Sequence, residues 1–362
     1  MARRILPRAP LRGHPAAPDG ARVLGSAAVT PDAPTAGAPA PGGQPPKRRL
    51  GFWLRITVSV VLLAVLISRI DLSAALPDRH LSTLLWLAGA FGCAMGGIVL
   101  SAWRWERVLL VFDRTVRLRT LVAHYFSGQF VGNVLPSTIG GDVVRVSRLT
   151  QTIGDAPTAF GSVALERLTG FIALPVLSLI GFAIDPSLLG ERRSWIALVA
   201  SGITVVALVV IVFLAGHPRL AGRYRHDEGW TRFIGAVHVG VERMRAEPRR
   251  AAAALGTAML YQTSLVVTMW CVAHALGAPV PTGALLAYIP AVAMAQVLPL
   301  SLAGLGVREG MLVLLLTPLG VTTGQAVGMG LLWYLTMLVV SLFGAPAFAV
   351  GARHRVEEPT AP

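Results

Sequence analysis

Three arginines stand out in this sequence because they lie inside or directly beside long apolar stretches. Arg145 and Arg308 each follow a segment rich in Gly and Pro, and Arg167 follows Glu166 well inside another apolar stretch. An arginine at the centre of a membrane helix costs about 2.5 to 3.5 kcal/mol on insertion scales. A guanidinium group binds phosphate through two parallel hydrogen bonds, and a helix N-terminus also attracts anions. We therefore predict that Arg145 and Arg308 bind an anionic group.

Polar and helix-breaking residues accompany both Arg145 and Arg308. The polar ones form the predicted lining of a binding site: Asn133, Ser137, Thr138, Gln296 and Ser301. Proline lacks the backbone N–H and glycine adopts conformations that other residues avoid, so helix breaks are predicted where they cluster. These positions are Pro136, Gly140, Gly141, Pro299, Gly304 and Gly306. Asp142 and Glu309 follow the breaks, where a carboxylate caps a helix N-terminus or takes part in gating; we favour capping.

Glu166 and Arg167 form a predicted intramembrane charge pair with two open interpretations. They could act as a counter-charge to the ligand or as a gate, or Glu166 could bind Arg145 or Arg308 and fix helix packing. A membrane enzyme with Glu166 as general base is a third reading, but the sequence lacks a nucleophile with a paired base, a metal motif and a nucleotide-binding loop. His124 and His274 are expected to be interior histidines with satisfied hydrogen bonds.

The composition places these residues in a membrane. Of 362 residues, 54% are hydrophobic and 14% are charged, and the mean hydropathy is +0.64, whereas soluble domains carry about 25% charged residues. Residues 251–307 and 310–352 contain no Asp, Glu, Lys or Arg, and both stretches exceed the ~20 residues that cross a bilayer. An ordinary cytosolic enzyme is therefore excluded.

The net charge of +14 lies mostly in loops between apolar segments, where basic residues set membrane topology. We therefore expect no nucleic-acid partner. The two cysteines lie inside apolar segments and the eight histidines are scattered, so we expect neither a metal nor a cofactor.

The predicted fold class is an all-α polytopic membrane protein with about six full spans and two re-entrant hairpins. The predicted spans are residues 50–70, 81–103, 156–184, 194–216, 251–276 and 321–351. The span 81–103 contains Gly92 and Gly96 at the spacing that lets membrane helices pack closely. Residues 1–49 are predicted to form a disordered tail rich in Pro, Ala and Gly. Residues 352–362 are predicted to form a short C-terminal tail. The transmembrane domain is thus residues 50–351.

Arginine asymmetry predicts the orientation. The Arg-rich loops 104–119 and 217–250 are assigned to the cytoplasm, and the balanced loops 71–80 and 185–193 to the outside. Residues 120–141 have Arg on both sides, so both of their ends are assigned to the cytoplasm, and a full span would contradict this assignment. A re-entrant hairpin that enters and leaves on the cytoplasmic face removes the contradiction. Residues 281–319 are predicted to form the second hairpin. Both termini are then cytoplasmic, and the protein is predicted to lie in the plasma (inner) membrane.

An internal repeat links the two predicted hairpins. Residues 135–145 align with residues 298–308, including Leu, Pro, a Gly and the final Arg. By the predicted topology, halves 50–184 and 194–351 enter the membrane from opposite faces, as in transporters built from inverted repeats. The alternative is a coincidence between two helix-breaking patterns in a chain rich in Gly and Pro.

Three motifs together carry a resemblance to a known family. They are residues 127–145 (SGQFVGNVLPSTIGGDVVR), Glu166-Arg167 and residues 298–310 (LPLSLAGLGVREG). In this order they resemble the lysylphosphatidylglycerol synthase transmembrane-region family, over roughly residues 50–350. The resemblance implies a flippase-like membrane domain, of the kind that carries aminoacylated phosphatidylglycerol across the bacterial membrane. Only residues 352–362 follow the last predicted span, so we do not expect the aminoacyltransferase activity of full-length synthases.

The resulting hypothesis is a protein that moves an anionic phospholipid or a lipid-linked glycan between leaflets. The sequence contains no ATP-binding loop, so transport would be passive or coupled to an ion. The alternative is a membrane subunit or scaffold that serves a separate soluble synthase or glycosyl-transferring enzyme. The lipid, the direction of transport and the oligomeric state stay open.

Overall fold

The computed structural model describes residues 80–134, 140–219, 231–296 and 304–349, all within the compact unit Pro46–Pro362. These residues form helices and contain no strand. Five helices are long and apolar enough to cross a membrane: α2 (Leu81–Val111), α5 (Ala156–Ile184), α6 (Ser194–Gly216), α8 (Pro248–Ala275) and α11 (Thr323–Leu342). The shorter helices are α3 (Leu118–Val134), α4 (Gly140–Ile153), α7 (Arg232–Ala246), α9 (Thr282–Gln296) and α10 (Val307–Leu316). Single 3₁₀ turns follow α5 and α10, at Pro186–Gly190 and Thr317–Leu319.

The predicted spans 156–184 and 194–216 coincide with α5 and α6. The predicted span 50–70 and the predicted tails lie outside the described residues. The span predicted at 81–103 is longer in the structure, because α2 continues to Val111. Arg104 ended the predicted span as the first residue of a cytoplasmic loop, yet it is a buried residue of this helix. The assignment of Arg104 to a loop was therefore wrong.

The last predicted span, residues 321–351, is also not one continuous helix. Helix α11 ends at Leu342, and residues 344–349 are helical again after Phe343. A side chain at Gly344 would collide with the carbonyl oxygen of Phe126, so the chain passes directly against α3 here. Arg148 donates to the carbonyl oxygens of Ala347 at 2.9 Å and Phe348 at 2.8 Å. These contacts fix the end of the described chain against the α3–α4 pair.

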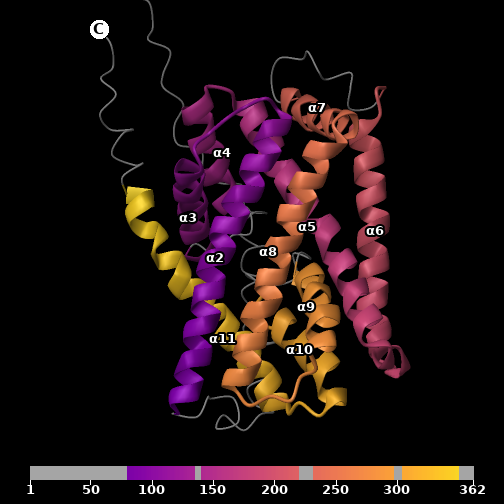
Figure 1. The fold of residues 1–362 in the computed structure, drawn as a ribbon. Coiled ribbons are helices and arrows are strands. Elements are labelled where there is room, and N and C mark those ends of the chain that lie inside the picture. The colour runs from indigo at the N-terminus through magenta and orange to yellow at the C-terminus, as the bar shows by residue number, and fades with distance from the viewer. Residues whose placement is uncertain (1–79, 135–139, 220–230, 297–303, 350–362) are drawn as a thin grey trace, which may run out of the picture. The chain divides into compact units, whose positions relative to one another are not determined.

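The predicted hairpin 281–319 contains the two helices α9 and α10, whereas the predicted hairpin 120–141 contains most of α3 and only the first two residues of α4, which continues to Ile153. Residues 135–139 separate α3 from α4 and residues 297–303 separate α9 from α10, and neither linker is among the described residues. Helices α3 and α4 pack so closely that a Cβ at Gly141 would lie 2.6 Å from the carbonyl oxygen of Gly128. Only glycine permits this approach. The α3–α4 pair lies towards the end of α2 that α7 covers, and the α9–α10 pair lies towards the opposite end (Figure 1).

The order of helices repeats along the chain. Helices α2, α3, α4 and α5 are followed later by α8, α9, α10 and α11, with a long helix, a broken pair and another long helix in each set. Helices α2 and α8 run side by side through the middle of the described helices (Figure 1). Gly97 faces Ser264 across this contact. Gly92 and Gly96 are exposed instead and lie against no other described helix, so the packing predicted for them is not found in the part of the chain that the structure describes.

Helices α5 and α6 differ in how deeply they are buried. Half of the most apolar part of α5 is buried, and it contacts α9 closely at Ser178, whose hydroxyl donates to the carbonyl of Ala287 at 2.7 Å. Most apolar side chains of α6 are exposed. A helix that is apolar all round and exposed to this extent is typical of a surface that faces lipid. Helix α5 is therefore central and α6 peripheral, which places Glu166 of α5 in the interior.

The start of α5 depends on Asp155. Its carboxylate accepts a hydrogen bond from the backbone N–H of Thr158 at 3.1 Å and another from the hydroxyl of Thr158 at 2.7 Å. Arg114 also donates to this carboxylate at 3.3 Å. Burial alone would raise the pKa of the Asp155 carboxyl, but these hydrogen bonds outweigh it, and the pKa lies below its usual value. Asp155 is thus a charged N-cap.

Replacing Asp155 by Ala should lower the free energy of unfolding by about 1 kcal/mol at neutral pH, because the N-cap is lost. A carboxyl whose pKa is lowered by folding stabilises the fold above its unfolded pKa of about 3.9. The difference between wild type and variant should therefore shrink as the pH falls through the lower folded pKa. Thermal unfolding in detergent, followed by circular dichroism at several pH values, measures it. Asp155→Asn, which keeps the cap, should lose much less stability, and an equal loss would contradict this account.

Candidate functional site

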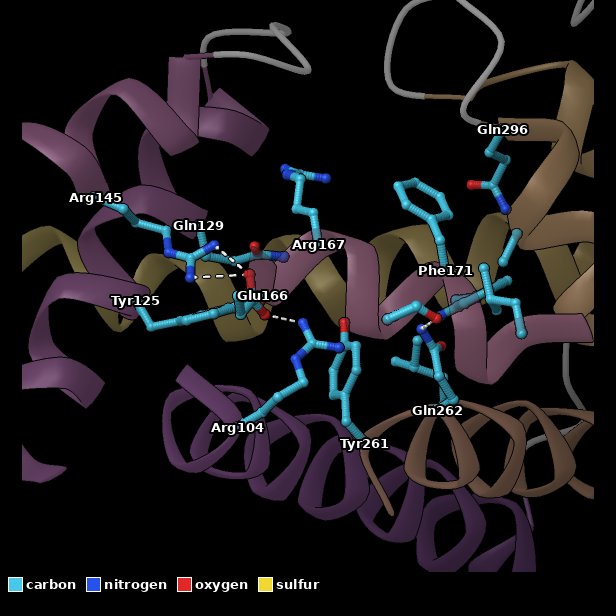
Figure 2. Close-up of a pocket in the computed structure, with 15 residues that line it drawn as sticks. Arg104, Tyr125, Gln129, Arg145, Glu166, Arg167, Phe171, Tyr261, Gln262 and Gln296 are labelled. Carbon is cyan, nitrogen blue, oxygen red and sulfur yellow. Dashed lines mark hydrogen bonds and ion pairs between the residues drawn. The ribbon is translucent and has the colours of Figure 1, made fainter. Parts of the chain in front are cut away.

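A cavity of about 350 Å³ lies where helices of both repeated sets meet. Helix α2 contributes Arg104, α4 contributes Arg145, and α5 contributes Glu166 and Arg167. Further lining residues come from α3, α8, α9 and α11: Tyr125, Gln129, Tyr261, Gln262, Gln296 and Trp333. Figure 2 shows the charged groups gathered at one end of this cavity and Gln296 at the other. We call this space the charged cavity.

Glu166 is the centre of the charged cavity. Its Oε1 accepts a hydrogen bond from Nη2 of Arg104, and its Oε2 accepts from Nη1 and Nη2 of Arg145, both at 3.1 Å (Figure 2). The exposed fraction is 1% for the Glu166 side chain and 5% for each arginine side chain. One buried carboxylate thus binds two buried guanidinium groups from two other helices.

Aromatic rings hold both arginines in place. The guanidinium carbon of Arg145 lies 4.3 Å from the ring centre of Trp105 and 4.2 Å from that of Tyr125. Arg104 lies 4.8 Å from the ring centre of Tyr261. Rings at these distances stabilise a cation through their negative faces, and more strongly where water is excluded. The two charges are therefore fixed before any ligand arrives.

A second acidic residue connects Arg145 to Arg167. Asp142 accepts a hydrogen bond from Nη1 of Arg145 at 3.3 Å and another from Nε of Arg167. The exposed fraction of the Arg167 side chain is 49%, against 21% for Asp142. Arg167 is therefore the accessible charge of the group, and its partner lies on α4, at the start of the second helix of the broken pair.

The charges of this group do not cancel. Arg104, Arg145 and Arg167 face only two carboxylates, Glu166 and Asp142, which leaves one positive charge among the described residues. Three buried N–H groups also have no hydrogen-bond partner in the described chain: Nε and Nη1 of Arg104, and Nε of Arg145. An unsatisfied buried donor costs about 1 to 3 kcal/mol, and more when it is charged. The group thus has an excess positive charge and buried donors without a partner among the described residues.

Gly170 makes room for Arg104. A Cβ at Gly170 would lie 2.8 Å from Nη1 of Arg104, one of the donors without a partner. The carbonyl of Gly170 accepts a hydrogen bond from Gln262 at 3.3 Å, which joins α8 to α5 at the same level. The absence of a side chain on α5 therefore allows the arginine of α2 to reach the cavity.

The predicted site residues separate into three groups in the structure. Arg145, Arg167, Glu166 and Gln296 line the charged cavity. Asn133 does not line it, and its side-chain amide instead donates to the carbonyl of Met337 at 3.4 Å. The remaining predicted lining and break residues lie outside the described residues: Pro136, Ser137, Thr138, Pro299 and Ser301.

The two helix starts after the breaks differ from the prediction in one respect. Gly140 and Gly141 are the first residues of α4, so Asp142 lies within the first turn and is not the residue before the helix. Arg145 consequently lies in the second turn of α4. Gly304 and Gly306 have φ angles of +76° and +82°, which favour glycine, and both precede α10 as predicted. Glu309 accepts a hydrogen bond from the N–H of Gly306 at 2.6 Å and so caps α10.

Arg308 is not equivalent to Arg145 in its surroundings. It donates to Oε1 of Glu309 from Nε at 3.0 Å and from Nη2 at 2.5 Å. It does not line the charged cavity, although its guanidinium lies 5.7 Å from the ring centre of Trp333, which does. Glu166 binds Arg104 and Arg145, so the alternative pairing of Glu166 with Arg308 was wrong. Glu166 and Arg167 likewise do not pair with each other.

Several residues of the site were not predicted from the sequence. Arg104 was assigned to a loop, and the aromatic residues Tyr125, Tyr261 and Trp333 were not singled out. One signal was present: Arg104 lies between Trp103 and Trp105, and amphipathic aromatic rings often accompany a membrane-embedded cation. His274 is exposed and bonded to the carbonyl of Trp270 at 2.9 Å, so its assignment to the interior was wrong.

Comparison with known proteins covers most of the chain. The model of one family, described as the lysylphosphatidylglycerol synthase TM region, matches residues 52–344. This range includes all helices from α2 to α11 and every described residue of the charged cavity. No curated protein matches the chain.

Proposed function

This chain belongs to the lysylphosphatidylglycerol synthase TM region family, and we propose that it moves a phospholipid or a lipid-linked headgroup between membrane leaflets. The observation that carries the proposal is the excess positive charge and the unpartnered donors of Arg104 and Arg145. A phosphate group offers several acceptors to such donors, and arginine binds it in a planar, bidentate geometry. In a membrane protein, the phosphate-bearing ligand at hand is a lipid.

The arrangement of helices supports transport rather than simple binding. Both broken pairs contribute to the charged cavity, through Arg145 of α4 and Gln296 of α9. Irregular backbone at membrane depth is tolerated where it is buried in protein or lines a polar cavity. In this proposal, the α3–α4 and α9–α10 pairs are re-entrant hairpins from opposite faces, and rocking of one repeat against the other exposes the cavity alternately to each leaflet.

The orientation follows from the arginines in the same proposal. The end of the described helices that carries Arg114, Arg243 and Arg250 is cytoplasmic by the positive-inside rule, and the membrane is the plasma membrane. Asp113 accepts hydrogen bonds from Arg243 and Arg250, both at 2.8 Å, which joins α2, α7 and α8 at this end. The opposite end would face outward.

Glu166 as the general base of an enzyme is the less favoured reading. Both oxygens of the Glu166 carboxylate already accept hydrogen bonds from the guanidinium groups of Arg104 and Arg145. A base of this kind would need a free acceptor lone pair next to the reacting atom.

A transport assay in liposomes tests the proposal. Purified protein is reconstituted with fluorescent phosphatidylglycerol, and the rate at which the lipid changes leaflets is compared with that of protein-free liposomes. Arg167→Gln should slow transfer about tenfold or more, because one charge-assisted hydrogen bond is worth about 1.5 to 3 kcal/mol. Arg167 is half-exposed, so the variant should still fold.

The chain offers a matched control for Arg167. Arg114 is 47% exposed, pairs with one aspartate, Asp155, and does not line the charged cavity. Arg114→Gln should transfer lipid at the wild-type rate. Equal slowing of both variants, or wild-type transfer no faster than in protein-free liposomes, would overturn the proposed function. Transfer that requires an added soluble transferase would favour the role of membrane subunit instead.

A further inference from the structure

A second hollow of about 730 Å³ lies beside the charged cavity and is lined almost entirely by apolar side chains. Its walls come mainly from α5, α6, α9 and α10, at Leu168, Val199, Ile203, Met294 and Met311. We call this space the apolar groove. Arg167 is the single charged side chain among the described residues that line it.

The apolar groove and the charged cavity share two residues. Arg167 and Phe171 line both spaces. They are four residues apart on α5 and therefore lie on the same face of this helix, and Figure 2 shows both side chains projecting to the same side. One ligand could thus occupy both spaces, with a charged part near Arg167 and an apolar part beyond Phe171.

The groove opens on the outer surface of α6. Its lining residues Val199, Ile203 and Ile211 have exposed fractions of 54%, 65% and 46%. Helix α6 is apolar along its length and is long enough to cross a membrane. Its exposed apolar surface faces hydrocarbon in a bilayer, so the groove opens sideways to lipid rather than to water.

We propose that the apolar groove binds a hydrocarbon chain of the same lipid whose phosphate lies in the charged cavity, and that the lipid enters sideways between α5 and α6. This inference rests on the proposed function and adds to it a requirement for an attached chain. The occupant is a membrane lipid because the groove adjoins the excess positive charge and opens to hydrocarbon. A free phosphate or a water-soluble headgroup would fill only the charged cavity.

Filling the groove tests the inference by binding rather than by transport. Ala200 lines the groove and is partly buried on α6, whereas Ala207 is exposed on the same helix and does not line the groove. Ala200→Trp should weaken binding of phosphatidylglycerol about tenfold or more, which corresponds to at least about 1.4 kcal/mol. Ala207→Trp should leave it unchanged. Native mass spectrometry of the protein in detergent, titrated with phosphatidylglycerol, measures both.

A chain-free headgroup supplies the second arm. Glycerophosphoglycerol, the water-soluble headgroup of the same lipid, should bind equally to wild type, Ala200→Trp and Ala207→Trp in equilibrium dialysis. Equal binding of phosphatidylglycerol to both tryptophan variants would overturn the inference. Should Ala200→Trp not fold, Ile203→Ser makes the groove polar without filling it, and Val206→Ser, at a similarly exposed position of α6 outside the groove, is its control.

The two proposals fail separately in these experiments. Groove-dependent binding without transfer between leaflets would overturn the transport function and leave the chain-binding site in place. Transfer that is unaffected by Ala200→Trp, together with unchanged phosphatidylglycerol binding, would overturn the site and leave the transport function in place.

Discussion

Replacing Glu166 by Gln is expected to lower the free energy of unfolding by about 3 to 5 kcal/mol, the range found when one partner of a buried ion pair is removed. Glu166 is the carboxylate that binds both Arg104 and Arg145, and both arginine side chains are 5% exposed. Without it, Arg104 keeps no carboxylate among the described residues, and Arg145 keeps only the contact with Asp142 at 3.3 Å. Denaturant or thermal unfolding in detergent, followed by circular dichroism, measures the loss.

Glu247→Gln is the control for this variant. Glu247 also pairs with an arginine, Arg250, at 2.6 Å, but both side chains are 41% exposed. Exposed pairs contribute about 0 to 1 kcal/mol, so the control should be close to wild type. The double variant Arg104→Gln with Glu166→Gln should recover part of the loss, because it removes one of the two buried charges that Glu166 neutralises. Equal stability of Glu166→Gln and Glu247→Gln would show that the buried pairs of Glu166 do not stabilise the fold.

Helices α5 and α6 were predictable because their boundaries depend on local sequence. Helix α5 begins after Asp155 and helix α6 follows a short polar loop, so hydropathy and capping residues mark the ends of both. Arg104 was not predictable in this way. A charged residue lowers the local hydropathy, so a predicted membrane span ends before it. The charge of Arg104 is instead neutralised inside the protein by Glu166, which is 62 residues away in the sequence. The pairing exists only in the folded chain.

The internal repeat was a good guide to the backbone and a poor guide to the site. Arg145 and Arg308 occupy matching positions after the two breaks, and both are buried. Applying the same spacing to the rest of the site places Met329 at the position of Glu166. Arg308 therefore has no carboxylate on the next long helix and binds its neighbour Glu309 instead. Matching backbone positions in the two repeats therefore do not give Arg145 and Arg308 matching ion-pair partners.

The asymmetry has a consequence for the cavity. Arg308 and Glu309 cancel each other, so the second set of helices contributes no excess charge. The excess comes from the first set, where Arg104 adds a second guanidinium to a carboxylate that Arg145 already binds through two hydrogen bonds. Removal of Arg104 would still leave both described carboxylates of the site paired, Glu166 with Arg145 and Asp142 with Arg145 and Arg167.

Arg104→Gln is therefore expected to abolish most lipid transfer without loss of stability. The variant leaves Glu166 paired with Arg145 and Asp142 paired with Arg167, and it removes two buried donor nitrogens that have no partner in the described part of the chain. The free energy of unfolding should stay within about 1 kcal/mol of wild type or rise, because no carboxylate is left unpaired and the desolvation cost of one buried charge is removed. The cavity loses its excess positive charge, so transfer of phosphatidylglycerol in liposomes should fall about tenfold or more.

Arg107→Gln is the matched control, because Arg107 lies on the same helix one turn further along, contacts the ring of Trp103 at 5.4 Å and does not line the charged cavity. It should transfer lipid at the wild-type rate. Arg104→Lys should fall between the two, since lysine keeps the charge but not the planar set of donors. Wild-type transfer by Arg104→Gln, measured on protein of unchanged stability, would show that the excess charge does not bind the headgroup. A loss of stability equal to that of Glu166→Gln would show instead that Arg104 is needed to hold α2 against α5.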